Sequence, residues 1–278
     1  MTDEFNATVA TCAGELELRV SVATDIGTIR AVNEDSVYAK PPVFLVADGM
    51  GGHSYGDRAS QSLVAAFADH FTENVPTNPV EVLKAIDDAN TRVQQLITEA
   101  DGPGAVAGTT LSGIALVEVS PSEDAAVAPH WMIFNVGDSR VYGWNGRDVV
   151  QITVDHSAVQ ELVSLGVITA EEALVHPDRN VITRAVGSDV EIETDLWLMP
   201  VQGHQVFVIC SDGLTKELDD RLISDTIRAH MLDSSPEYSL SDTLVRLAVK
   251  RGGRDNVSVV TLESNAVGRE GVEVPAAE

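Results

Sequence analysis

Apolar and polar residues follow two different periods along the chain, and these periods predict its strands and helices. Residues 15–23 alternate strictly between polar and apolar, which predicts a strand with one buried face. Uninterrupted runs rich in β-branched and aromatic residues predict buried strands at residues 43–47, 131–136 and 206–210. Asn145-Gly146 separates the runs 140–144 and 148–152, so we expect a two-residue β-hairpin there.

Helical periods appear in pairs between these groups of strands. Residues 58–71 are followed by a second helix, with Asn78 as its N-cap and Pro79 at its first position. Further helices are expected at residues 159–165, 219–230 and 241–250. A capping box that starts at Thr169 predicts one more short helix. Paired helices favour antiparallel sheets with helices outside them over a parallel βαβ sheet. We predict one domain over residues 15–263, with flexible tails at residues 1–14 and 264–278.

Composition narrows the classes of partner. The chain has 278 residues, enough for a large core, and 43 acidic against 18 basic residues leave a formal net charge of -25. Such a charge disfavours nucleic acid and anionic membranes as partners. Cys12 and Cys210 form neither a disulfide framework nor a metal-spaced pair. Residues 1–17 do not resemble a signal peptide, and no stretch approaches the roughly 20 apolar residues of a membrane helix, so we expect a cytoplasmic protein.

Four aspartates stand at the ends of apolar runs. Asp48, Asp138 and Asp212 each follow such a run, and Asp255 comes just before the run 257–260. A single Asp-Gly is foremost a turn signal, and these runs therefore predict strands closed by turns. Four carboxylates in comparable settings would repel one another unless cations were bound between them. Because no His or Cys cluster accompanies them, Mg²⁺ or Mn²⁺ fits this set better than Zn²⁺.

A series of short motifs runs in a fixed order through most of the chain. They occupy residues 30–35, 47–53, 108–110, 135–140, 155–157, 183–187, 210–214 and 253–257. This ordered set resembles the bacterial form of the metal-dependent protein phosphatases of the PPM (type 2C) class. The resemblance implies an α+β fold, a four-layer αββα sandwich in which two antiparallel sheets lie face to face with helices on both outer sides. It also implies hydrolysis of phosphoserine and phosphothreonine in proteins, opposing cytoplasmic Ser/Thr kinases.

The resemblance assigns metal-binding roles to the four aspartates. Asp48 is expected to bridge two Mn²⁺ or Mg²⁺ ions, with the backbone carbonyl of Gly49 on one of them. Asp212 and Asp255 are expected to hold the other ion, and Asp138 with Asp212 to hold a third, weaker one. Two ions roughly 3.5–4 Å apart can share a water, lower its pKa and aim it at phosphorus.

Three more residues receive roles from the first motif. Glu34 and Asp35 are expected to act on the second ion, either directly or through waters. Arg30 matches the phosphate-binding arginine of the family, since a guanidinium fork suits two phosphoryl oxygens. We therefore predict Asp48, Asp212 and Arg30 as the catalytic set, acting on phosphorylated proteins as a monomer.

The sequence departs from the family at one position. Animal members carry a histidine directly after the Asp-Gly, as a proposed general acid, whereas this chain has Met50 there. We do not transfer that role to His53. Arg140 is expected to be a structural ion-pair partner, and residues 155–187 resemble the family's flap beside the third metal.

Other functions were weighed against this one. Residues 52–56 match the Gly-x-Ser-x-Gly elbow of serine hydrolases, but that elbow needs a strand leading directly into it. A cysteine phosphatase needs an arginine six residues after its cysteine, where Cys210 has Lys216 and Cys12 has Leu18. A catalytically weak phosphoprotein-binding module, or a phosphatase dedicated to one regulatory partner, remains as the alternative.

Overall fold

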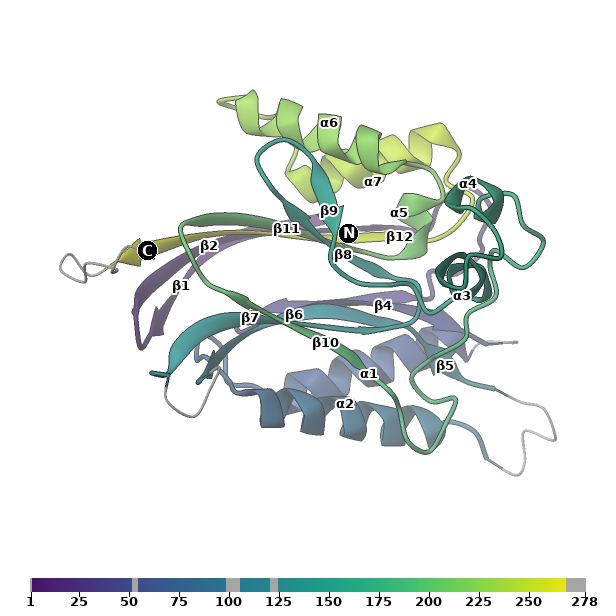
Figure 1. The fold of residues 1–278 in the computed structure, drawn as a ribbon, viewed down its shortest axis with the longest axis horizontal. Helices are drawn as coiled ribbons and strands as arrows, with labels where there is room; N and C mark the ends of the chain where they lie inside the picture. The colour runs from purple at the N-terminus through teal and green to yellow at the C-terminus, as the bar shows by residue number, and fades with distance from the viewer. Residues whose placement is uncertain (1, 52–54, 99–105, 121–124, 269–278) are drawn as a thin grey trace.

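Two antiparallel sheets lie face to face at the centre of the computed structural model, which describes residues 2–51, 55–98, 106–120 and 125–268 (Figure 1). The first, six-stranded sheet has the order β1 (Thr2–Thr11), β2 (Gly14–Asp25), β12 (Val257–Gly268), β11 (His204–Cys210), β8 (Arg140–Trp144), β9 (Val149–Gln151). The second has the order β10 (Asp195–Pro200), β7 (Ala128–Val136), β6 (Leu111–Val119), β4 (Val43–Met50), β3 (Asp35–Lys40), with β5 (Gly108–Thr109) paired to β4.

A pair of helices covers the outer face of each sheet (Figure 1). Helices α1 (Gly56–His70) and α2 (Pro79–Gln94) lie on the second sheet, and α6 (Asp220–Leu232) and α7 (Leu240–Arg251) lie on the first. Three short helices, α3 (Ala158–Ser164), α4 (Ala170–Ala173) and α5 (Asp212–Thr215), lie near one end of the sandwich. The predicted α+β sandwich of four layers, helices–sheet–sheet–helices, is confirmed.

Three apolar layers hold these elements together. Strand β4 shows why an uninterrupted apolar run was needed: Phe44 and Val46 face the other sheet, whereas Leu45 faces α1 and α2. Between the sheets, the rings of Trp131 and Phe207 meet edge to face with centroids 5.8 Å apart. Because successive side chains of a strand point to opposite faces, a central strand of this sandwich must be apolar at every position.

The capping signals formed where the sequence predicted them. The side chain of Asn78 accepts a hydrogen bond from the N–H of Glu81 at 3.1 Å, and Pro79 opens α2. Thr169 and Glu172 form the predicted capping box of α4. The predicted hairpin joins β8 and β9, but its turn is longer than expected, because Trp144 pairs with Val149 and the loop covers residues 145–148.

The predicted N-terminal tail is wrong. Strand β1 pairs with β2 along its whole length, from Thr2 opposite Ala23 to Thr11 opposite Gly14. Val9 is fully buried, and Phe5 packs against the core between the sheets. Most side chains of this segment are small or polar, so its alternation of buried and exposed positions is weak in the sequence. The strand forms because β2 offers it a pairing partner. At the other end, β12 extends to Gly268, and residues 269–278 lie outside the described part of the chain.

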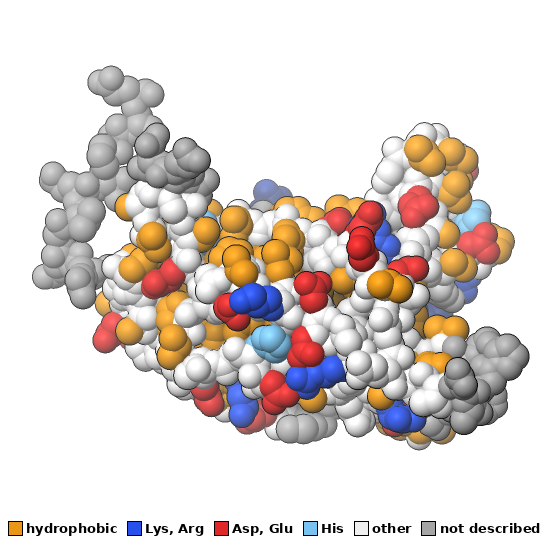
Figure 2. Space-filling view, turned by 90° about the horizontal axis from the view of Figure 1, so that it is seen from below, with side chains coloured by type: hydrophobic (Ala, Val, Ile, Leu, Met, Phe, Trp, Pro, Cys, Tyr) orange, Lys and Arg blue, Asp and Glu red, His pale blue; other side chains and the backbone are white. Residues whose placement is uncertain are grey.

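Charged side chains on the face over α1 and α2 are mixed in sign. Figure 2 shows the basic groups of this face scattered among acidic ones, without a continuous basic surface. Arg92 pairs with Asp69 and Asp88 at 2.8 and 2.7 Å, and Lys84 pairs with Glu81 at 2.8 Å. Of the helices built from the described residues, none combines the length and the apolar character needed to cross a membrane.

Candidate metal centre

The structure brings the four aspartates and Asp35 together from both sheets. Asp35 and Asp48 are direct cross-strand partners on β3 and β4. Asp138 follows β7, and Asp212 is the first residue of α5 after β11. Asp255 comes two residues before β12 begins. The side chain of Ser211 joins the two sheets here, since its Oγ donates to Asp35 Oδ2 at 2.8 Å.

Two of the Asp-Gly pairs are not turns, which corrects the sequence interpretation. Asp48-Gly49 lies inside β4, where Gly49 pairs with Thr109 of β5. Asp212-Gly213 opens α5. The glycines are required by close backbone packing: a Cβ on Gly49 would lie 2.0 Å from the carbonyl oxygen of Gly56, and one on Gly213 would lie 1.9 Å from that of Asn256. The backbone beside each of these two aspartates therefore packs against another backbone segment with no room for a side chain.

Burial makes ionisation of these carboxylates unfavourable. It raises the pKa of Asp35 to about 7, although hydrogen bonds from Ser258 and Ser211 oppose the rise and the charge of Asp212 adds to it. Burial, and then the charges of Asp212 and Asp155, likewise raise the pKa of Asp138 to about 7.

The pKa of Asp48 is raised well above its usual value by burial and then by Asp35, Asp212 and Asp138. That of Asp212 is raised by burial despite the opposing charge of Lys216. Buried carboxylates that lie close together repel one another when ionised, and bound cations would relieve this repulsion.

Two basic side chains already contact this cluster. Lys216 Nζ lies 2.5 Å from Asp212 Oδ2 and 2.8 Å from Asp255 Oδ2. Arg30 Nη2 lies 2.8 Å from Asp255 Oδ1, and its other terminal nitrogen lies 3.8 Å from Glu34 Oε2. Burial would raise the pKa of Asp255, but Lys216 and then Arg30 hold it below its usual value. Within the described ranges, no group of three or more acidic, His or Cys side chains is already arranged to hold a metal ion.

The residues present nevertheless fit a divalent ion. Among the described side chains, one oxygen each of Asp35, Asp138 and Asp212 is buried without a hydrogen-bond partner. Buried polar atoms in folded proteins almost always have a partner, so three carboxylate oxygens unpaired in one cluster point to a ligand. All are hard oxygen donors, the type that Mg²⁺ and Mn²⁺ take. Lys216 contacts two other carboxylate oxygens of the cluster, Oδ2 of Asp212 and Oδ2 of Asp255.

Several polar residues that the sequence analysis gave no role support the cluster. Asn256 accepts the N–H of Glu34 at 2.9 Å and donates to the carbonyls of Ile26 and Val32, both at 3.0 Å. It thereby ties the loop that carries Arg30 to the start of β12. Asn256 could have been found from its place directly after Asp255 in a quoted motif.

Thr110 supports the opposite side of the cluster. Its Oγ1 accepts the N–H of Asp48 at 2.9 Å and lies 2.7 Å from Ser139 Oγ. Both residues are fully buried and belong to motifs quoted above, so their signal was present in the sequence. Thr110 holds the backbone at Asp48, and Ser139 lies directly after Asp138, so both support candidate ligands.

The other residues singled out in the sequence lie at the edge of the cluster, near it or outside the described part of the chain. Glu34 is partly buried and lies against Gly56 at the start of α1. Met50 ends β4 and is partly exposed. His53 lies outside the described residues. The predicted role of Arg140 as a structural partner is confirmed, because it binds Asp155 through two nitrogens at 2.9 and 2.7 Å.

The segment 155–187, predicted as a flap, is anchored at both of its ends. His156 is buried and accepts the N–H of Gly137 at 3.1 Å, next to Asp138. Val186 exchanges two backbone hydrogen bonds with Thr109 at 3.1 and 2.9 Å. Between these anchors, α3 and α4 have no buried residue, and Leu165 and Leu174 are exposed. Its ends therefore contribute to the cluster's framework, whereas its middle faces solvent.

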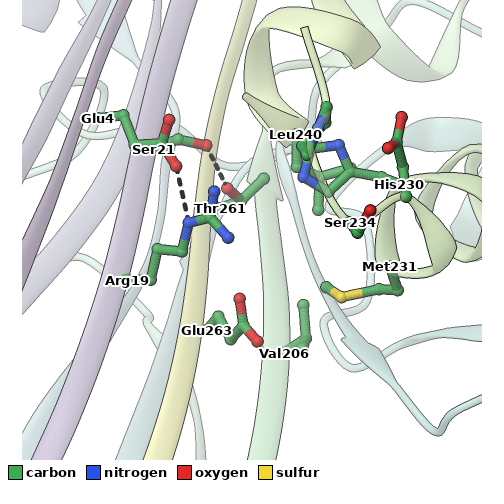
Figure 3. A pocket seen from close by; sticks show the side chains of 12 residues that line it. Glu4, Arg19, Ser21, Val206, His230, Met231, Ser234, Leu240, Thr261 and Glu263 are labelled. Atoms are coloured by element: carbon green, nitrogen blue, oxygen red, sulfur yellow. Dashed lines mark hydrogen bonds and ion pairs between the residues drawn. The ribbon is translucent and has the colours of Figure 1, made fainter. Parts of the chain in front are cut away.

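A cavity of about 260 Å³ lies elsewhere, on the outer face of the first sheet beside the end of α6 (Figure 3). Several of its polar groups are paired with one another: Arg19 binds Glu4 at 2.7 Å, and the hydroxyl of Ser21 lies 2.6 Å from that of Thr261. None of the candidate metal ligands lines it. The acidic cluster is therefore the stronger candidate for chemistry.

Comparison with known proteins gives a consistent result. Residues 31–247 match the Protein phosphatase 2C family. The chain is 33% identical over 252 residues to a serine/threonine phosphatase, stp, of Listeria welshimeri, covering 87% of this chain and 94% of that protein. It is 36% identical over 254 residues to the serine/threonine protein phosphatase PstP of Mycobacterium tuberculosis, covering 89% of this chain but only 45% of that longer protein.

Solved structures agree with these relatives. The catalytic domain of PstP in complex with two manganese ions superposes with a TM-score of 0.74 at 33% identity, covering 90% of this chain and 100% of that one. The Ser-Thr phosphatase MsPP of Mycobacterium smegmatis, in complex with cacodylate, gives 0.71 at 31% identity, covering 92% of this chain and 99% of that one.

Proposed function

Because the chain belongs to the protein phosphatase 2C family, we propose that it hydrolyses phosphoserine and phosphothreonine in proteins at the acidic cluster between its two sheets. The observation that carries this proposal is the set of buried carboxylate oxygens without partners on Asp35, Asp138 and Asp212. The enzyme is a metal-dependent phosphomonoester hydrolase, and its cofactors are Mn²⁺ or Mg²⁺.

The chain's own residues divide the work of holding these cofactors. Asp48 and the carbonyl of Gly49 would hold one ion, and Asp48 with Asp212 and Asp255 would hold the other. Asp138 and Asp212 would hold a third, weaker ion. When bound, the metal ions supply a water of lowered pKa as nucleophile and neutralise the phosphoryl oxygens. The bound ions would also reduce the repulsion between the carboxylates.

Glu34 and Asp35 would act on the second ion, either directly or through waters. Asp35 is held by Ser211, so its free oxygen keeps one direction, and Glu34 is held by Asn256 through its backbone. Met50 has no proton to donate, and water is the proposed source of the proton for the departing serine or threonine oxygen.

Arg30 is placed to orient the substrate phosphate. Its side chain is 46% exposed, whereas Asp255, which it contacts, is only 14% exposed. The guanidinium therefore stands at the solvent side of the cluster with donors still free for a second anion. A planar fork of this kind binds two phosphoryl oxygens at once.

The direct test measures phosphate release from a phosphothreonine peptide with and without a chelator. Hydrolysis is expected in Mn²⁺, to be abolished by excess EDTA and to return when Mn²⁺ is added in excess, because the nucleophile depends on the metal. Circular dichroism in EDTA verifies that the chain stays folded. Hydrolysis that continues unchanged in EDTA would reject the metal mechanism and reopen the other phosphatase classes.

Arg30→Ala is expected to raise KM for the phosphopeptide about tenfold, because a charge-assisted pair of hydrogen bonds to phosphate is lost. Arg30→Lys should fall between, since a point charge replaces the fork. Steady-state kinetics with Arg221→Ala as the control checks this, because the Arg221 side chain is 91% exposed on α6 and pairs with Asp225, which is not a candidate ligand. A KM that does not change in Arg30→Ala contradicts the substrate role.

The biological setting extends this proposal. The enzyme opposes Ser/Thr kinases of the cytoplasm and acts as a monomer on their phosphorylated substrates. A catalytically weak phosphoprotein-binding module is the competing function, and it predicts peptide binding without turnover in the Mn²⁺ assay. A phosphatase dedicated to one regulatory partner would share the chemistry and differ only in its substrate.

A further inference from the structure

One lysine stands among the candidate ligands without any role in the phosphatase chemistry described above. Lys216 is the C-cap of α5, and its backbone N–H donates to the carbonyl of Asp212 at 2.8 Å. This single helical turn brings the ammonium back over Asp212, to 2.5 Å from its Oδ2. The same ammonium reaches Asp255 Oδ2, on the segment before β12, at 2.8 Å.

The ammonium engages the oxygens that the proposed function assigns to a metal ion. Each carboxylate gives Lys216 one oxygen, and Arg30 Nη2 contacts both oxygens of Asp255, Oδ1 at 2.8 Å and Oδ2 at 3.0 Å. A divalent cation between Asp212 and Asp255 needs lone pairs of these same carboxylates. It would also stand close to a positive charge that is held by two ion pairs. The lysine and the ion therefore compete for one place.

The structure also gives Lys216 a way to leave. Its side chain is 30% exposed, while the two carboxylates it contacts are each 14% exposed. A long flexible side chain at the edge of a site can move its ammonium into water while its carbon chain stays in contact. A divalent cation that binds the two carboxylates can therefore displace the ammonium into water.

We propose that Lys216 is an internal competitor of the catalytic metal, an ammonium that bridges Asp212 and Asp255 when no ion is bound and weakens the binding of the divalent cation there. This inference rests on the proposed function and adds regulation to the same site. The site then needs a higher concentration of free metal ion to become occupied than it would need without the lysine. The lysine also removes the repulsion between the two aspartates in the metal-free protein.

The test compares Mn²⁺ binding by the whole protein and by Lys216→Met, using isothermal titration calorimetry after EDTA treatment and buffer exchange at one pH. Methionine keeps most of the apolar stem of lysine and removes the ammonium with its charge and its hydrogen-bond donors. The variant is expected to bind Mn²⁺ about tenfold more tightly, because no bound cation has to be displaced. Its melting temperature in EDTA should fall, because two aspartates lose their shared partner. The rise in melting temperature on adding Mn²⁺ should be larger for the variant than for the unchanged protein.

Lys250→Met is the matched control, since Lys250 is exposed on the last turn of α7 and lies outside the acidic cluster. Its Mn²⁺ affinity should equal that of the unchanged protein. Lys216→Gln gives the same measurement if Lys216→Met does not fold, because an amide can still donate to both carboxylates without carrying charge. Mn²⁺ affinity that is equal or weaker in the charge-free variant overturns the inference.

Two further outcomes separate this inference from the proposed function. If the unchanged protein binds Mn²⁺ and hydrolyses phosphopeptide while the lysine variant binds no more tightly, only the role of Lys216 is wrong. If the unchanged protein neither binds Mn²⁺ nor hydrolyses phosphopeptide, the proposed function and this inference are both overturned.

Discussion

Asp212→Asn is expected to lower kcat on a phosphothreonine peptide about a thousandfold, equivalent to roughly 4 kcal/mol of transition-state stabilisation. Asp212 contributes an unpaired buried oxygen and is assigned to two of the three ions, so the amide weakens both sites. The fold should survive, because a buried carboxylate with a raised pKa loses a charge that the surroundings disfavour. Lys216 retains its contact with Asp255 at 2.8 Å.

The measurement combines steady-state kinetics in saturating Mn²⁺, Mn²⁺ titration calorimetry and thermal melting in EDTA. We expect loss of turnover and weaker metal binding, with a melting temperature in EDTA that is unchanged or higher. Asp225→Asn is the control, since its side chain is 50% exposed on α6 and pairs with Arg221 and Arg228 on the same helix. Normal turnover by Asp212→Asn would show that the ligand assignment is wrong.

Gly49→Ala is expected to destabilise the protein by about 3 kcal/mol and to lower turnover in parallel, although it changes no ligand side chain. The added Cβ would lie 2.0 Å from the carbonyl oxygen of Gly56 and 2.6 Å from that of Glu34. Both neighbours are backbone atoms, so neither can rotate away. Strand β4 or the start of α1 must move, and Asp48 and Glu34 move with them.

Gly143→Ala is the matched control, because Gly143 also lies in a strand, and its Cβ would meet only the flexible end of Ile152 at 3.3 Å. Urea unfolding of both variants in EDTA, with kcat in Mn²⁺, separates the two positions. Gly143→Ala should stay close to the unchanged protein in both measurements. A Gly49→Ala protein as stable and as active as that control would mean that the close approach of β4 to α1 is unimportant.

The sequence predicted the architecture well wherever one local signal was strong. Uninterrupted apolar runs became the central strands, and Asn78-Pro79 opened a helix. It failed where the signal depended on a neighbour. Thr2–Thr11 contains many small and polar residues, and it became a strand because the edge of β2 offered a partner along its whole length.

The candidate ligands were predicted as residue types, and their local setting was partly wrong. Asp48-Gly49 and Asp212-Gly213 read as turns, because Asp-Gly is a common turn sequence. In the structure these glycines let backbones approach within a distance that no side chain allows. A local pattern cannot distinguish the two causes, since the second depends on Gly56 and Asn256.

By itself, the sequence determined the central strands, most helices with their caps and an oxygen-only set of ligands, because backbone preference and burial period are properties of neighbouring residues. Only the tertiary structure decided that Lys216 bridges Asp212 and Asp255 and that Arg30 contacts Asp255, a residue 225 positions away along the chain. Such contacts follow from how two sheets stack. The charge balance of the centre, and so its affinity for metal, is therefore a property of the assembled sandwich.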